Sequence, residues 1–239
     1  MKPDELYNDI VTFCKLNTDE EIKKKYSRYF KEGLYDAYGL PQHLMQNKVK
    51  EILNKKDVDS QIIRETSKLL VKSLKYEESV FAIQFYKSFL ISFDSQAFVD
   101  ITVWFETGIR NWAHCDSICG ELISPLLKKN IITYKDLKPW IKAQNKFQRR
   151  AVPVSLINLL KTSNDYLPLF RFIEPLMIDA EREVNQGVGW FLREAWKKQK
   201  DETESFLMKW KEISPRLIFQ YACEKMTPGE KIRFKRTKL

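Results

Sequence analysis

Glycine is scarce in this sequence: 7 of the 239 residues are glycine, about 3% against a usual share of about 7%. Sheet sandwiches use glycine in their turns, and doubly wound α/β folds use it in phosphate-binding loops. No segment alternates apolar and polar residues for long enough to require a sheet. The composition therefore favours a helical protein.

Long apolar segments and a disulfide framework are also missing. Charged residues interrupt every apolar stretch well before the ~18 residues that cross a bilayer. The N-terminal sequence MKPDELYNDI lacks the basic-then-apolar order of a signal peptide. The 4 cysteines are sparse and irregularly spaced. We therefore expect a cytoplasmic protein with reduced thiols and no membrane partner.

Histidine is rarer still: the chain has 2, His43 and His114. His114, Cys115 and Cys119 could hold a metal ion, but a tetrahedral zinc site needs a second pair of ligands. His43 is far from them in the sequence. Packing cysteines are the favoured interpretation, so we expect neither a metal nor a cofactor.

What the chain has in excess is positive charge. Its 41 lysines and arginines outnumber 32 aspartates and glutamates, a formal net charge of +9, which favours a polyanionic partner, most often a nucleic acid. Apolar residues make up 44% of the chain, which excludes a disordered protein. Residues 193–239 alone hold 13 basic and 7 acidic side chains. We expect the end of that segment to be a solvated, frayed tail.

Apolar residues recur at helical spacing along the whole chain. The pattern predicts helices at 4–15, 19–31, 42–55, 60–74, 77–90 and 95–108, with a loop around Gly33, Gly39 and Pro41. From residue 77 onward each helix pair takes about 35–40 residues, the period of two-helix solenoid repeats. We therefore expect an all-α fold, a curved superhelical array of antiparallel HEAT-like helix pairs. The expected single domain, 1–239, comprises N-terminal helices at 1–75, repeat pairs at 76–230 and a basic tail at 231–239.

Three short stretches stand out from this helical background. In the sequence NWAHCD, Trp112 and Asp116 are four residues apart and therefore share one face of a helix. The sequence QRRAV holds two adjacent arginines, Arg149 and Arg150. The sequence GVGWFLRE sets two glycines beside Trp190. Since each glycine costs a helix about 1 kcal/mol relative to alanine, that pair indicates close approach of another backbone or of a ligand.

Together these stretches resemble the AlkD-like family of DNA alkylation repair glycosylases. The matching motifs are Trp-x-x-x-Asp at Trp112, an arginine before a small apolar helix at Arg150, and Gly-Trp-x-Leu-Arg-Glu at Gly189. The sequence RYFK, which begins at Arg28, is similar to the family's N-terminal helix, which supplies an aromatic side chain to DNA. The resemblance implies a HEAT-repeat fold and the excision of N3- and N7-alkylated purines from duplex DNA.

The resemblance implies catalytic roles for Asp116, Trp112, Trp190 and Arg150. An alkylated purine is a cationic leaving group, and breaking its glycosidic bond develops positive charge on the deoxyribose. Asp116 would stabilise that charge and orient the attacking water. Trp112 and Trp190 would pack on the sugar, and Arg150 would hold a backbone phosphate. No lysine is required as a nucleophile, so we expect a monofunctional enzyme.

Two further side chains are candidates for DNA contact beside Arg150. We expect Arg149 to face solvent or a phosphate. Tyr29 either reaches DNA with its hydroxyl or fills the first helix interface. Arg193 and Glu194 are expected to make structural pairs between helices.

The sequence departs from the family beside Trp112. The family commonly has an acidic residue next to this tryptophan, where this chain has Ala113. His114 follows, and although it could titrate near neutral pH, we expect it to make a contact on the helix surface.

Two other functions remain open from the sequence. The same basic solenoid could bind damaged or branched DNA without cutting it, or it could serve as a scaffold for an acidic protein. For the enzyme, the expected partner is double-stranded DNA containing alkylated purines. We expect a monomer with no obligatory protein partner.

Overall fold

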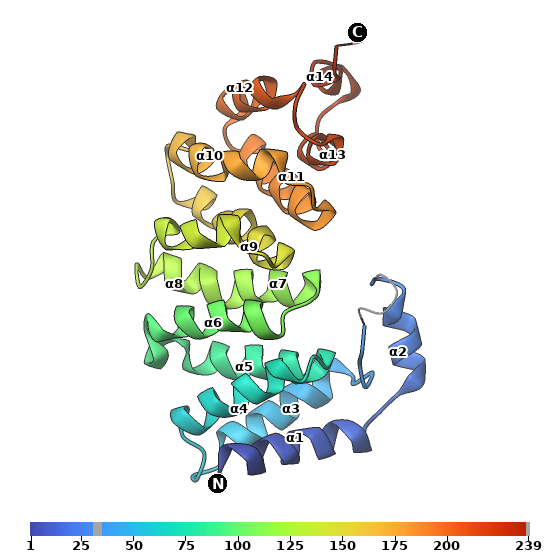
Figure 1. The fold of residues 1–239 in the computed structure, drawn as a ribbon, viewed down its shortest axis with the longest axis vertical. Coiled ribbons are helices and arrows are strands. Elements are labelled where there is room, and N and C mark those ends of the chain that lie inside the picture. The colour runs from blue at the N-terminus through green and yellow to red at the C-terminus, as the bar shows by residue number, and fades with distance from the viewer. Residues whose placement is uncertain (31–34, 238–239) are drawn as a thin grey trace. The chain divides into compact units, whose positions relative to one another are not determined.

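The computed structural model describes residues 1–30 and 35–237, which are helical with no β-strand among them (Figure 1). The all-α prediction is confirmed for this part of the chain. Lys31 and Gly33, placed by the sequence at the end of a helix and in the loop after it, lie outside the described residues. The chain forms two compact units, Met1–Leu122 and Ile123–Leu239. A single domain over 1–239 stays a prediction.

The first unit is built from helices whose direction alternates from α4 to α7 (Figure 1). Their bounds are α1 Pro3–Leu16, α2 Glu20–Ser27, α3 Gln42–Leu53, α4 Ser60–Lys72, α5 Tyr76–Phe93, α6 Gln96–Thr107 and α7 Trp112–Ile118. Each helix predicted from the sequence in this unit is present. The largest difference is at α2, which ends at Ser27 because the next three residues form a turn.

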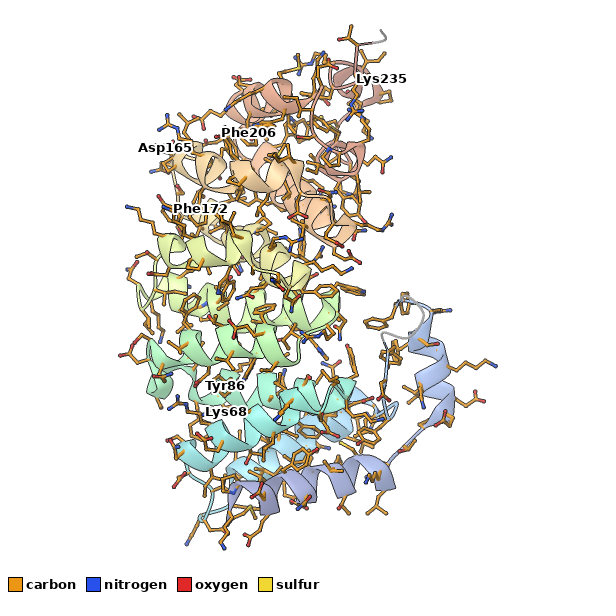
Figure 2. All side chains as sticks on the ribbon, viewed as in Figure 1. Lys68, Tyr86, Asp165, Phe172, Phe206 and Lys235 are labelled. Atoms are coloured by element: carbon orange, nitrogen blue, oxygen red, sulfur yellow. The ribbon has the colours of Figure 1, made fainter. Side chains whose placement is uncertain are left out.

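Helix α5 is the centre of the first unit. It packs against α3, α4, α6 and α7, and residues on all sides of it are buried, among them Phe81, Phe85 and Tyr86. Each such side chain stabilises the fold by about 1.5–3 kcal/mol. Tyr86 (Figure 2) also donates from its hydroxyl to Asp100 of α6 over 2.8 Å. The buried helix predicted from the all-round apolar pattern at 77–90 is confirmed.

The loop before α3 fixes the start of α2. Gly39 has φ +83°, and a Cβ there would lie 2.1 Å from the carbonyl oxygen of Asp19, the N-cap of α2. The backbone N–H groups of Tyr38, Gly39 and Leu40 donate to the buried carboxylate of Glu77 over 2.8, 2.7 and 3.1 Å. Three donors on one carboxylate satisfy its charge inside the unit. This loop therefore holds the N-terminal end of α2 on α5.

The second unit is arranged around α11. Its elements are α8 Ser124–Lys128, η2 Tyr134–Lys142, α9 Lys146–Leu156, η3 Leu159–Lys161, α10 Leu167–Ile173, η4 Glu174–Ile178, α11 Arg182–Trp196, α12 Lys200–Trp210, α13 Arg216–Ala222 and α14 Pro228–Ile232, and a π-helical turn, η1 Cys119–Ile123, precedes them. Helix α11 packs closely on both α9 and α13.

The two glycines of α11 permit this packing. A Cβ on Gly187 would lie 3.1 Å from Arg150 Cγ of α9, and one on Gly189 would lie 2.5 Å from Tyr221 Cβ of α13. The close approach predicted from the glycine pair is therefore confirmed, and the neighbours are two helices of the same unit.

The basic tail is not frayed, contrary to the prediction. Phe234 is 1% exposed, and its carbonyl oxygen accepts a hydrogen bond from Arg216 at 2.9 Å. Arg236 donates to the carbonyl oxygen of Ser214 at 2.9 Å, and Thr237 binds the carboxylate of Glu212. A buried aromatic side chain and these bonds attach the segment to the last helices. Residues 238–239 lie outside the described part.

Two sequence-derived expectations concern cysteines and membranes. All four cysteines are free and buried, as packing cysteines would be. Within the residues described, no helix combines the length and the apolarity needed to span a bilayer.

Candidate functional site

Helix α7 carries the first predicted pair, Trp112 and Asp116. The helix starts because Asn111 caps it: the Asn111 Oδ1 atom accepts the backbone N–H of His114 at 2.9 Å. Trp112 is the first helical residue and is 41% exposed, and Asp116 is half-buried one turn later. An exposed aromatic ring and a carboxylate therefore lie on one side of one short helix, as the spacing predicted.

The indole of Trp112 is fixed by the segment that follows α2. Its Nε1–H donates to the carbonyl oxygen of Tyr29 at 3.3 Å, and its ring stacks on Phe30 with 5.7 Å between centroids and 20° between planes. Because the N–H is used within the protein, the part of Trp112 open to a ligand is carbon surface and π-electron density. Such a surface packs on sugar C–H groups and attracts cations.

Tyr29 itself points outward. Its side chain is 55% exposed, with the guanidinium of Arg28 4.9 Å above the ring and donating to its hydroxyl at 2.9 Å. Of the two alternatives left by the sequence, filling of a helix interface is therefore wrong. Tyr29 and Arg28 together present a cation and a ring at the end of α2.

An aromatic cluster, defined here as Phe30, Tyr35, Tyr76, Trp112 and His114, surrounds the start of α7. The ring centroids of Phe30 and Tyr35 are 4.7 Å apart. The centroid of Tyr76 lies 5.1 Å from that of Tyr35 and 5.7 Å from that of Phe30. The sequence analysis identified Trp112 but did not predict the aromatic side chains that pack around it. The available signal was the density of aromatic residues between positions 26 and 38, five in thirteen residues.

His114 is buried rather than on the helix surface, and the prediction of a surface contact is wrong. It is 3% exposed, its ring stacks on Tyr76 at 4.5 Å, and Nε2 lies 3.0 Å from the Tyr76 carbonyl oxygen. Burial lowers the pKa of His114 to about 4. The imidazole is therefore neutral at neutral pH and does not titrate there.

Arg150 lies in the second unit, on α9. It is 6% exposed and donates from Nη1 to the carbonyl oxygen of Glu183 at 2.8 Å. Its aliphatic stem passes Gly187, whose missing side chain leaves the space for it. A guanidinium held this way has a fixed position at the contact between α9 and α11.

Arg149 is committed to structural contacts. Its Nε and Nη2 atoms bind the Asp179 carboxylate over 2.6 and 3.3 Å, and Nη1 donates to the carbonyl oxygens of Ala143 and Gln144 over 2.7 and 3.0 Å. Four of the five guanidinium N–H groups thus have partners. The expectation that Arg149 faces solvent is wrong, because this side chain joins α9 to the segment before α11.

Trp190 is half-buried on α11, one residue after Gly189. Near it, Arg193 pairs with Glu224, beyond the end of α13, which confirms the structural pairing predicted for Arg193. Glu194 pairs with Arg193 of its own helix and with Lys197, the residue that directly follows that helix. The pairing between helices predicted for Glu194 is therefore wrong.

Charge is divided unequally between the two units. Residues 1–122 hold 17 basic and 19 acidic side chains, a net charge of −2, whereas residues 123–239 hold 24 and 13, a net charge of +11. The whole positive excess of the chain therefore belongs to the second unit. Its attraction to a polyanion is independent of sequence and weakens with salt.

A family model described as "DNA alkylation repair enzyme" matches residues 14–226. The chain belongs to this family. A solved structure described as a predicted DNA alkylation repair enzyme from Enterococcus faecalis has a similar fold, with a TM-score of 0.74 at 16% sequence identity, over 89% of this chain and 98% of that one. A search of curated proteins finds no match.

Proposed function

We propose that this chain is a DNA glycosylase that hydrolyses the N-glycosidic bond of positively charged N3- and N7-alkylpurines in duplex DNA. The observation that carries the proposal is the α7 pair: an exposed indole, its N–H already bonded, one helical turn from a carboxylate. Membership of the DNA alkylation repair enzyme family supports alkylated DNA as the substrate. The second unit, with its net charge of +11, would provide the attraction to duplex DNA.

The chemistry needs little more than these groups. Alkylation gives the purine a positive charge, so the glycosidic electron pair leaves with the base and neutralises it. Water adds to C1′ of the deoxyribose and releases one proton. The sugar carries positive charge at the transition state, and Asp116 would stabilise it and orient the water. The π-face of Trp112 would add about 0.5–2 kcal/mol of attraction for the same charge.

The remaining residues receive roles from the family resemblance. Trp190 would contact the damaged nucleotide, and Arg150 would hold a backbone phosphate. Tyr29, with Arg28 against it, would contact DNA from the end of α2. Arg149 would contribute to DNA binding through the position of α9, because its own N–H groups bind protein acceptors. No metal, cofactor or lysine nucleophile is required, and a monomer suffices to hold one duplex.

Base release by the wild-type protein and by Asp116→Asn tests the proposal. With excess protein over a duplex that contains 7-methylguanine, the wild type should release the base in a single turnover. Asp116→Asn should lose most of this release while binding the duplex nearly as tightly. Glu106→Gln, an exposed acid on α6 of the same unit, is the matched control and should behave as the wild type.

The outcomes separate three functions. Equal release by Asp116→Asn would contradict the catalytic role of that carboxylate. Tight binding by the wild type without release at saturating protein would instead favour a protein that binds damaged or branched DNA. Weak binding with a flat dependence on salt would mean few phosphate contacts and would favour a protein scaffold.

A further inference from the structure

His114 lies on the inner side of α7, away from the proposed catalytic pair. It is two residues after Trp112, about 200° around the helix axis. Its ring is stacked on Tyr76 at the first position of α5, with 4.5 Å between centroids and 28° between planes. His114 is one of three buried residues of α7, beside Cys115 and Ile118, and its imidazole contacts the start of α5. The outer side of α7 presents Trp112 and Asp116.

The hydrogen bonds of His114 define its tautomer. The Tyr76 carbonyl oxygen, 3.0 Å from Nε2, can only accept, so Nε2 carries the hydrogen and donates it. Nδ1 then accepts from Asn111 Nδ2 at 2.9 Å. The amide oxygen of Asn111 is already bonded to the backbone N–H of His114, which fixes the orientation of the amide. Each polar atom of the imidazole is satisfied by the protein.

Two routes connect this imidazole to the indole. One is the α7 backbone, because Asn111 both caps the helix and binds His114 Nδ1. The other is a circuit of rings: His114 contacts Tyr76, Tyr76 contacts Phe30 at 5.7 Å, and Phe30 stacks on Trp112 at 5.7 Å. Both routes lie within the first unit and end at Trp112. We therefore expect a displaced imidazole to move Trp112 through the α7 backbone and through the ring contacts.

We propose that His114 is a positioning residue that fixes the direction in which α7 presents Trp112 and Asp116 to DNA. It is not a catalytic acid or base, because both ring nitrogens bind protein partners and the side chain is buried. The inference deepens the proposed glycosylase function and rests on it for its effect on rate. Its effect on the geometry of Trp112 is measurable without any enzymatic activity.

Three substitutions at two positions dissect the contact. His114→Leu removes both hydrogen bonds and the aromatic stack. His114→Gln keeps an N–H donor that can reach the Tyr76 carbonyl oxygen. Asn111→Asp keeps the oxygen that caps α7 and replaces the donor to Nδ1 with an acceptor. Ile63→Val, in the buried core of α4, is the control for reduced stability without a change in the ring circuit.

Two measurements are made on each variant below its unfolding temperature. The first is the single-turnover rate constant for 7-methylguanine release beside the dissociation constant of the duplex. The second is the ¹⁹F NMR spectrum of protein labelled with 5-fluorotryptophan, with the Trp112 resonance assigned from Trp112→Phe. Trp104, which is buried in the same unit, is the internal reference.

The inference predicts a loss of rate without a loss of binding. Misplacement of a reacting group by about 1 Å costs up to about 100-fold in rate, so His114→Leu should fall by about 10- to 100-fold in rate constant at a nearly unchanged dissociation constant. His114→Gln should recover part of that loss. The Trp112 resonance should shift or broaden in His114→Leu and Asn111→Asp and not in Ile63→Val.

A folded His114→Leu protein with the wild-type rate constant and an unchanged Trp112 resonance would overturn the inference. If His114→Leu does not fold, His114→Gln and Asn111→Asp decide by the same two readouts. If the wild type releases no alkylpurine, the proposed function is wrong, and the Trp112 resonance alone then decides whether His114 positions the indole.

Discussion

The indole N–H of Trp112 donates to the carbonyl oxygen of Tyr29, 83 residues earlier in the chain, over 3.3 Å. This bond attaches the end of α2 to the first residue of α7, and Phe30 completes the attachment by stacking on the same indole. The segment that carries the exposed Arg28 and Tyr29 is therefore in direct contact with the ring proposed to meet the sugar. Any contact that DNA makes with the end of α2 would act on Trp112 through these two neighbours.

Trp112→Phe should separate the two roles of the indole. Phenylalanine keeps an aromatic face and loses the donor to Tyr29, whose backbone lies in an exposed turn, so stability should fall by no more than about 0.5–1.5 kcal/mol. Because a phenyl ring attracts a cation more weakly than an indole, base release should fall several-fold. Trp112→Ala should fall further, since it also removes the surface on which Phe30 stacks. Single-turnover release and thermal unfolding measure both effects, and Trp210→Phe in the second unit is the matched control.

The glycines of α11 should respond differently to alanine. At Gly189 a Cβ would lie 2.5 Å from Tyr221 Cβ and 2.7 Å from the Ile218 carbonyl oxygen, neither of which is the end of a flexible side chain. Gly189→Ala should therefore destabilise the protein by about 1–3 kcal/mol through overpacking, despite the gain of about 1 kcal/mol in helix propensity. At Gly187 the nearest atoms are 3.1 and 3.3 Å away, so alanine should cost less. Urea unfolding of both variants checks the order, and a more stable Gly189→Ala would contradict the packing argument.

The stability of the first unit should depend on pH through His114. Its pKa in the folded protein is lowered to about 4, whereas the ordinary value in an unfolded chain is about 6.5. The unfolded chain binds more protons than the folded protein between these two pH values. The contribution of His114 to stability therefore rises with pH across this window and is fully present above about pH 6.5. Acidification from pH 7 to pH 4.5 should remove about 2–3 kcal/mol through this residue.

The measurement is the free energy of urea unfolding at both pH values, for the wild type and for His114→Gln. Carboxylates with lowered pKa values, such as Glu230 and Asp136, lose their contribution at still lower pH and do so in both proteins. The difference between the two proteins therefore isolates the imidazole. An equal loss of stability in both would show that His114 is not the group that titrates.

Helical periodicity was enough to predict the fold, because the signal is local. The all-round apolar pattern of α5 and the two glycines of α11 each reported the burial that the structure shows. The predictions about single polar residues failed where the partner is distant in sequence. His114 is buried against Tyr76, which lies 38 residues earlier in the chain. The guanidinium of Arg149 is bonded to the carboxylate of Asp179, which lies 30 residues later.

The basic tail was mispredicted for a different reason. Its charge run suggested a solvated segment, but the aromatic Phe234 in the middle of the run was a local signal for an anchor, and it is buried. The motif spacing of Trp112 and Asp116 was sufficient to place both on one side of α7. It could not reveal that Phe30 and the Tyr29 carbonyl oxygen already occupy part of the indole.

The two adjacent arginines of α9 should differ in how they affect DNA binding. Each phosphate contact that is lost should reduce the slope of log affinity against log salt by about 0.9. Arg149→Gln should leave the slope unchanged, because the guanidinium binds Asp179 and two carbonyl oxygens. It should instead lower stability by about 1–3 kcal/mol, the cost of leaving partners of a charged group unpaired.

Arg150 provides the comparison within the same experiment. If it holds a phosphate as proposed, Arg150→Gln should reduce the salt slope by about one contact, provided that thermal unfolding shows the variant to be folded at the temperature of the assay. Arg150→Lys keeps the charge and should preserve most of the slope while it loses the bidentate geometry. If Arg149→Gln reduces the salt slope and Arg150→Gln leaves it unchanged, then Arg149 is the residue that holds the phosphate and Arg150 is the structural one. In that case the ion pair with Asp179 would have to open when DNA binds, since the same N–H groups cannot serve both acceptors.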